Sequence, residues 1–136
     1  MTSERDPFSA GLLGADLLHD ETAPVLETPH ATPRPPLDRG EREVKDAVLR
    51  MGGLVEDQIL AALDALVRHD ADAALAVIQA DRGVNEAQRI LSTQIATIIA
   101  TQQPVARDLR FLLSLDHVTY ELERMGDHAA SVAKQA

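Results

Sequence analysis

The chain has no cysteine, no tryptophan and only three aromatic residues, two Phe and one Tyr. Without cysteine, a disulfide framework is excluded, and so are metal sites and nucleophiles built on thiolates. The absence fits a reducing compartment such as the cytoplasm. The 136 residues are enough for one domain with a core of its own.

Basic stripes and long apolar runs are also missing. The net charge is −9 and the pI about 4.9. Nucleic-acid binding depends on basic side chains that neutralise phosphates, so DNA and RNA are excluded as partners. No apolar run approaches the roughly 20 residues that span a bilayer, and the N-terminal residues lack the pattern of a signal peptide. We expect a soluble, cytoplasmic protein without membrane insertion.

Proline is confined almost entirely to the beginning of the chain, where six of the seven prolines precede residue 40. Such a stretch cannot form a regular helix or strand ladder. We therefore predict a disordered, proline-rich tail over residues 1–37. Residues 38–136 are rich in Ala, Leu, Ile, Val and charged residues, which favour helix, and they are predicted to form a single bundle.

Apolar residues at helical spacing predict two long helices over residues 41–68 and 71–102. Asp38, with Glu41 as capping-box partner, is the expected N-cap of the first helix, and Asp70 that of the second. Gly52–Gly53 interrupts the first helix, as a tolerated kink or a point where another helix approaches closely. The expected core positions are Val44, Val48, Met51, Val55, Ala62, Leu66, Val77, Val84, Leu91 and Ile98.

A third helix is predicted from Pro104, which suits a first helical position, to about Lys134. Two interlocked series describe its core seam, one of Phe111, Val118, Met125 and Val132 and one of Leu115, Leu122 and Ala129. The short connections make successive helices antiparallel. The fold class is therefore all-α, an up-down-up three-helix bundle.

Two pairs of oxygen-bearing side chains are spaced four residues apart, Glu123 with Asp127 and Asp81 with Asn85. On a helix this spacing places both members on one face, where like charges repel. On the third helix, the acids are predicted to point away from the seam, towards solvent or another molecule. A solvated face neutralised by arginines such as Arg124 is the simpler interpretation.

The two pairs are expected at the same height of the bundle. Asp81 lies 22 positions before residue 103, where the chain turns, and Asp127 lies 24 positions after it. Three carboxylates and one amide oxygen would then lie side by side, a donor set that Mg²⁺, Mn²⁺ or iron accepts. Asp81, Asn85, Glu123 and Asp127 are thus the candidate metal ligands, with Arg82 and Arg124 offering the competing neutralisation.

Catalytic motifs are absent from the sequence. It contains no HExxH, no GxSxG and no glycine-rich phosphate loop. His117 and His128 lie off the predicted seam and are expected to be solvated, with metal ligation the less favoured alternative. We identify no catalytic residues, and the protein is not expected to be an enzyme.

The string "QQPVARDLR" followed by "ELERMGDHA" resembles the third helix of a PhoU repeat, and residues 43–134 resemble one whole three-helix repeat. The resemblance implies a regulator of phosphate uptake that acts with a phosphate ABC transporter and a phosphate-sensing histidine kinase. It also implies surface metal binding through E(D)xxxD motifs, of which Glu123–Asp127 is a full match. Asp81–Asn85 matches a second motif with its last acid replaced, and the family typically carries two repeats where this chain has one.

Three hypotheses remain open. The first is a PhoU-like adaptor that regulates phosphate-starvation signalling by binding partner proteins, and the second is a structural, homodimer-forming helical module without signalling output. The third, a metal-dependent enzyme, is disfavoured by the lack of ligand histidines. A homodimer is expected because three helices sharing one seam leave much side surface uncovered.

Overall fold

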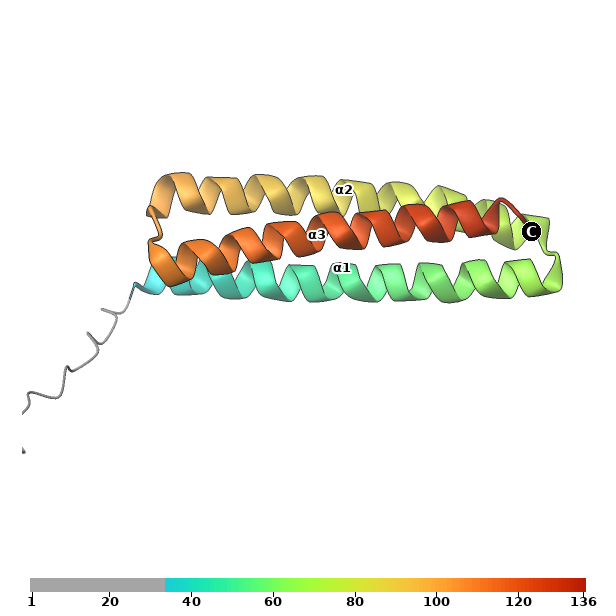
Figure 1. Ribbon diagram of the computed structural model, residues 1–136, viewed down its shortest axis with the longest axis horizontal. Coiled ribbons are helices and arrows are strands. Elements are labelled where there is room, and N and C mark those ends of the chain that lie inside the picture. The colour runs from blue at the N-terminus through green and yellow to red at the C-terminus, as the bar shows by residue number, and fades with distance from the viewer. Residues whose placement is uncertain (1–33) are drawn as a thin grey trace, which may run out of the picture. The chain divides into compact units, whose positions relative to one another are not determined.

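The computed structural model describes residues 34–136, which form three long helices. They are α1 (Pro35–Arg68), α2 (Ala71–Gln102) and α3 (Ala106–Ala133), and each contacts both others. As Figure 1 shows, α2 runs antiparallel to α1 and α3. The all-α, up-down-up bundle predicted from the sequence is confirmed. Among the described helices, none combines the length and apolar character that crossing a membrane requires.

The first helix begins earlier than predicted. It starts at Pro35, a residue type suited to the first helical turn. Asp38 is not the N-cap but lies in the first turn, where an acid complements the helix dipole. Leu37, assigned to the tail from the sequence, is 1% exposed and belongs to the core. The rest of the predicted tail, residues 1–33, lies outside the described residues.

The boundaries of α2 and α3 follow the sequence more closely. The Asp70 side chain accepts a hydrogen bond from the backbone N–H of Ala73 at 2.9 Å, which confirms the predicted N-cap. The chain leaves α2 at Gln103, just before Pro104, as expected. Helix α3 begins at Ala106 rather than Pro104.

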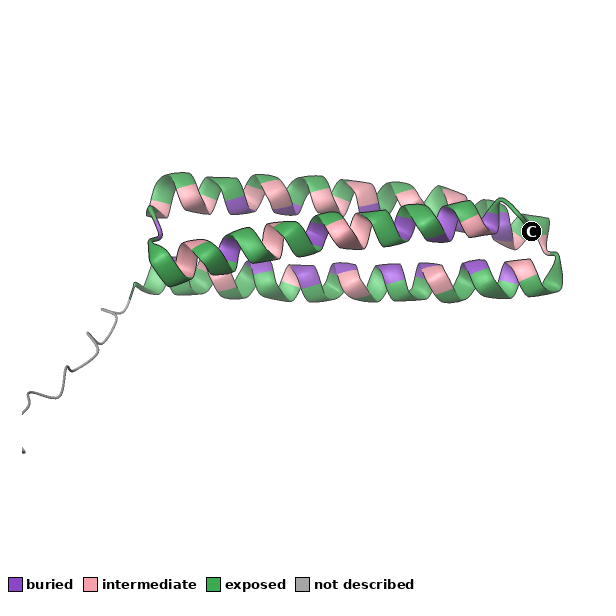
Figure 2. Ribbon diagram, in the orientation of Figure 1, coloured by how far each residue is buried: buried purple, intermediate pink, exposed green. Residues whose placement is uncertain are grey.

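The core of α1 and α2 matches the predicted series, with the exception that Leu66 and Ile98 are only partly buried. The two predicted series of α3 differ, because Leu115 and Leu122 pack against the core and Ala129 is 4% exposed, as predicted. Phe111, Val118 and Met125 are 36%, 42% and 46% exposed, so the prediction for this series is wrong. The strip of α3 that is buried in place of this series contains mostly small residues. It is visible as the purple bands of Figure 2. Its fully buried members are Leu112, Thr119, Gly126, Ala129, Ala130 and Ala133.

Gly52 and Gly53 do not interrupt α1, which continues as one helix through both. A Cβ atom added at either position would meet nothing within 4 Å. Neither glycine is therefore required by a close approach of another helix within the described part of the chain.

Candidate functional site

The acidic pair of α3 lies at the border with α2 rather than on a fully solvated face. Glu123 is half-buried and Asp127 is exposed. Burial raises the pKa of the Glu123 carboxyl, and the nearby charges of Asp127 and Asp81 raise it further. Arg124, whose guanidinium also pairs with Glu121 at 3.2 Å, lowers this pKa by a smaller amount. Glu123 is thus less exposed than expected, whereas Asp127 is exposed as expected.

The second pair, on α2, is hydrogen-bonded internally. The Asn85 side-chain amide donates to Asp81 Oδ2 at 3.1 Å. The other carboxylate oxygen, Oδ1, accepts from the side-chain amide of Gln58 on α1 at 3.1 Å. Both oxygens of Asp81 are therefore held by N–H donors, and Asn85 presents its amino group, not its oxygen, to the pair.

Gln58 connects all three helices at this level. Its amide nitrogen also donates to the backbone carbonyl of Gly126 on α3 at 3.3 Å. The residue is 5% exposed, and its carbonyl oxygen Oε1 is buried without a hydrogen-bond partner. Gln58 is not among the predicted site residues, although a glutamine in the apolar series of the first helix, between Val55 and Ala62, is a signal that identifies it.

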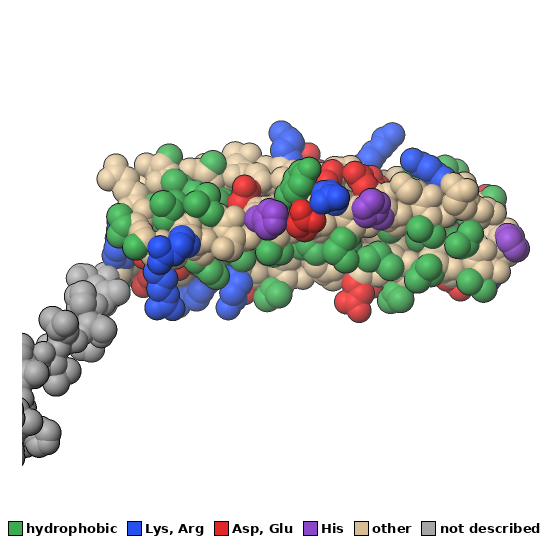
Figure 3. Space-filling view, viewed as in Figure 1, with side chains coloured by type: hydrophobic (Ala, Val, Ile, Leu, Met, Phe, Trp, Pro, Cys, Tyr) green, Lys and Arg blue, Asp and Glu red, His purple; other side chains and the backbone are tan. Residues whose placement is uncertain are grey.

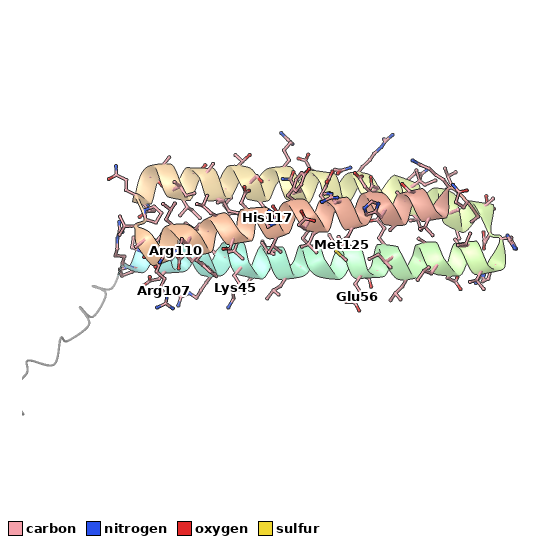
Figure 4. All side chains as sticks on the ribbon, in the orientation of Figure 1. Lys45, Glu56, Arg107, Arg110, His117 and Met125 are labelled. Atoms are coloured by element: carbon pink, nitrogen blue, oxygen red, sulfur yellow. The ribbon has the colours of Figure 1, made fainter. Side chains whose placement is uncertain are left out.

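The border between α2 and α3 stays polar beyond these pairs. The Ser92 hydroxyl donates to Asp116 Oδ1 at 2.6 Å, and the Gln88 amide donates to Ser92 Oγ at 3.0 Å. Figure 3 shows acidic side chains and histidines gathered along this side of α3. Figure 4 places His117 here, and both His117 and His128 are exposed, as predicted.

The borders of α1 have a different character. The groove between α1 and α2 is lined mostly by apolar and small side chains, among them Leu54, Ala61 and Ala76. The groove between α1 and α3 is lined by Ile59, Leu63 and Met125, among others. Hydrophobic side chains cover this second border in Figure 3, and Figure 4 shows Met125 lying there. The bundle therefore has one polar border and two apolar ones.

Of the four predicted metal ligands, Glu123 lies near enough to Asp127 on α3 and Asp81 on α2 for their charges to raise the pKa of its carboxyl. The carboxylate oxygens are ligands that a hard cation accepts, whereas Asn85 presents its side-chain N–H group to Asp81. Among residues 34–136, however, no three His, Cys, Asp or Glu side chains converge as a preformed metal cluster. The fit is one of chemistry and charge rather than of closed coordination.

Comparison with known proteins identifies the family. The profile of the PhoU domain matches residues 48–136, most of α1 and all of α2 and α3. The chain is 38% identical over 94 residues to a phosphate-specific transport system accessory protein PhoU homolog of Pseudomonas putida, covering 69% of this chain and 37% of that protein. The Escherichia coli K12 accessory protein PhoU is 37% identical over 93 residues, 68% of this chain and 39% of its own length.

A PhoU homolog of Clostridium acetobutylicum gives the same picture, with 37% identity over 93 residues, 68% of this chain and 42% of the relative. The chain thus spans about two fifths of the length of these relatives.

Proposed function

The chain belongs to the PhoU domain family, and we propose that it is a regulatory adaptor of phosphate uptake and phosphate-starvation signalling. The observation that carries the proposal is the match over residues 48–136, together with relatives named as accessory proteins of a phosphate-specific transport system. The adaptor would act in the cytoplasm by binding a phosphate ABC transporter, a phosphate-sensing histidine kinase, or both. No catalytic step is part of this function.

The apolar surface of α1 supports an adaptor role. Leu49, Leu60 and Val67 are 67%, 59% and 78% exposed, although they belong to the most apolar residue types. Apolar side chains exposed on a helix can supply the area of a protein–protein contact. The two apolar grooves flank the same helix.

Deletion of the gene tests the adaptor hypothesis against the alternative of a purely structural module. We expect a phosphate-starvation reporter to become active in phosphate-rich medium, and expression of the full chain to restore repression. An unchanged reporter would support the structural alternative and contradict the adaptor.

We also propose that two copies of the chain associate as a homodimer through the apolar border of α1 and α3. Light scattering should give about twice the monomer mass of 14.7 kDa. Leu60→Glu should shift the population to monomer, whereas Leu75→Glu, at a similarly exposed leucine of α2, should not. A monomer at micromolar concentration would contradict the proposal.

In addition to the homodimer, we propose that the protein binds a cation. The site consists of Asp81, Asn85, Glu123 and Asp127 and is called the acidic site below. The raised pKa of Glu123 supports it, because this carboxyl is half-buried among like charges that a divalent cation or ferric iron would offset. The carboxylate oxygens would hold the ion, and Asn85 would contribute its amide oxygen after its side chain turns. The bound ion would supply charge neutralisation between α2 and α3.

Thermal unfolding in a titration with Mg²⁺ or Mn²⁺ tests this site. We expect the melting temperature to rise with metal concentration, because a ligand of the folded state stabilises it by mass action. Asp127→Asn should lose the response, and Asp57→Asn, an exposed acid of α1, should keep it. If millimolar metal leaves the wild-type melting temperature unchanged, the acids form only a solvated face beside Arg124.

A further inference from the structure

We propose that Gln58 is a positioning residue of the acidic site, and that from inside the core it holds Asp81 in the orientation in which the site works. The inference rests on the proposed cation binding at that site. It assigns to α1, which contributes none of the four candidate ligands, a direct influence on the site between α2 and α3.

Burial and hydrogen bonding argue that Gln58 has more than a packing role. The residue lies in the apolar strip of α1, yet it keeps an amide whose Oε1 has no partner. A buried carbonyl without a hydrogen bond destabilises the folded state, and an apolar side chain of the same shape would avoid this loss. The amide N–H group of Gln58, which an apolar side chain would lack, donates hydrogen bonds to Asp81 Oδ1 at 3.1 Å and to the Gly126 carbonyl at 3.3 Å.

The Gln58 amide lies against Gly126 of α3. A Cβ atom at Gly126 would lie 3.2 Å from Gln58 Oε1 and 3.4 Å from Asp81 Oδ1. The absence of a side chain at Gly126 therefore leaves room for both groups against α3. Because Gln58 donates to Oδ1, it would keep the Asp81 carboxylate oriented from α1 when Asn85, which holds Oδ2, turns to the ion.

Groups that hydrogen-bond to a metal ligand set its orientation, and their loss typically weakens metal binding by 10- to 100-fold. Asp81 is the candidate carboxylate that receives such support from another helix. If Gln58 is replaced, Asp81 keeps its charge but loses the donor that fixes one of its oxygens. The expected defect is thus a weaker affinity for the cation, although all the acidic residues are still present.

The test measures Mn²⁺ binding by calorimetry to the full chain and to Gln58→Met, which keeps the length of the side chain and removes the amide. We expect affinity to fall by about tenfold. The matched control is Gln88→Met, at a half-buried glutamine of α2 that bonds to Ser92 and not to Asp81. This control should bind Mn²⁺ within twofold of wild type, and equal affinities of all three proteins would overturn the inference.

A second measurement needs no metal and separates the inference from the cation proposal. The NMR signals of the Asn85 side-chain amide report whether Asp81 Oδ2 still accepts its hydrogen bond. They should shift in Gln58→Met and in a second variant, Gln58→Leu, but not in Gln88→Met. If the wild-type protein binds no Mn²⁺, the cation proposal fails. Independently of that result, unchanged Asn85 signals in both Gln58 variants would refute the positioning role of Gln58.

Discussion

The two ends of the bundle are filled by different kinds of side chain. The end near the start of α1 contains large aliphatic residues, namely Leu37, Val44, Val48, Met51, Val55, Val84, Leu91, Ile95 and Leu112, which we call the aliphatic half. The other end contains Ala62, Ala65, Ala74, Val77, Ala129 and Ala133, the alanine half. Helices separated by alanine can pack closer than helices separated by leucine, and the core of this bundle is filled by large side chains at one end and by small ones at the other.

The polar layer of Gln58, Asp81 and Gly126 lies between the two halves. In sequence, Gln58 separates Val55 of the aliphatic half from Ala62 of the alanine half. Gly126 likewise lies between Leu112 and Ala129. The candidate site is thus found where the filling of the bundle changes, and four pairs of substitutions can test how far the difference between the halves extends.

The largest effect is expected in the aliphatic half. Leu112 is fully buried, so Leu112→Ala should lower the free energy of unfolding by about 2–5 kcal/mol through lost burial and a cavity. Chemical denaturation measures this change. Leu113→Ala, at a neighbour that is 52% exposed, should cost less than about 0.5 kcal/mol. Similar losses at both positions would contradict the observed orientation of α3.

In the alanine half, enlargement rather than truncation should destabilise. Ala65 is 0% exposed, so Ala65→Leu forces the helices apart at an expected loss of about 1–3 kcal/mol. Ala61→Leu, one turn earlier on the exposed side of α1, is the control and should be close to neutral. If both variants melt like wild type, the alanine half is loosely packed and the comparison fails.

Two glycines distinguish the polar layer from the free surface of α1. Gly53→Ala should raise stability by about 0.5–1 kcal/mol, because alanine favours helix and nothing lies within 4 Å of the new Cβ. Gly126→Ala should show no such gain, since its Cβ would meet Gln58, Val84 and Asp81 at 3.2–3.4 Å. Equal gains in thermal unfolding would show that the polar layer yields easily.

The smallest effect depends on pH. Because the pKa of Glu123 in the folded protein is raised above its usual value of 4.5, the ionised carboxyl destabilises the folded state at pH 7, and this penalty disappears as the pH falls towards 4.5. Glu123→Gln should therefore increase stability by a few tenths of a kcal/mol at pH 7, with no gain at pH 4.

Glu86→Gln is the matched control for this pH dependence. The hydrogen bond from Arg89 holds the pKa of Glu86 below its usual value. Removal of the Glu86 carboxyl should therefore lower stability at neutral pH, and the loss should fade as the pH falls through the folded pKa. Unfolding curves that give the same sign for both variants would contradict the burial of Glu123.

Several features could be predicted from residue type and spacing. Asp70 caps α2 because its side chain can reach a free N–H of the first turn, a local interaction that needs no partner helix. The common height of Asp81 and Asp127 follows from the rise of a helix and the position of one turn. The start of α1 differs from the prediction because proline, which breaks regular structure elsewhere, fits the first turn of a helix at Pro35 and Pro36.

The sequence by itself determined three helices, their order and the pairing of acids along each helix, since these depend on short-range geometry. Only the tertiary structure decided which side of α3 is buried, because Phe111 and Leu112 lie on adjacent sides of one helix and the neighbouring helices select between them. The packing of the three helices also brings Glu123 to the border with α2 and Gln58 within hydrogen-bond distance of Asp81. Gln58 is 23 positions from Asp81 and 68 positions from Gly126 in the sequence. Contacts over such separations are not encoded in any local pattern, so the polar layer could be recognised only once the helices were packed.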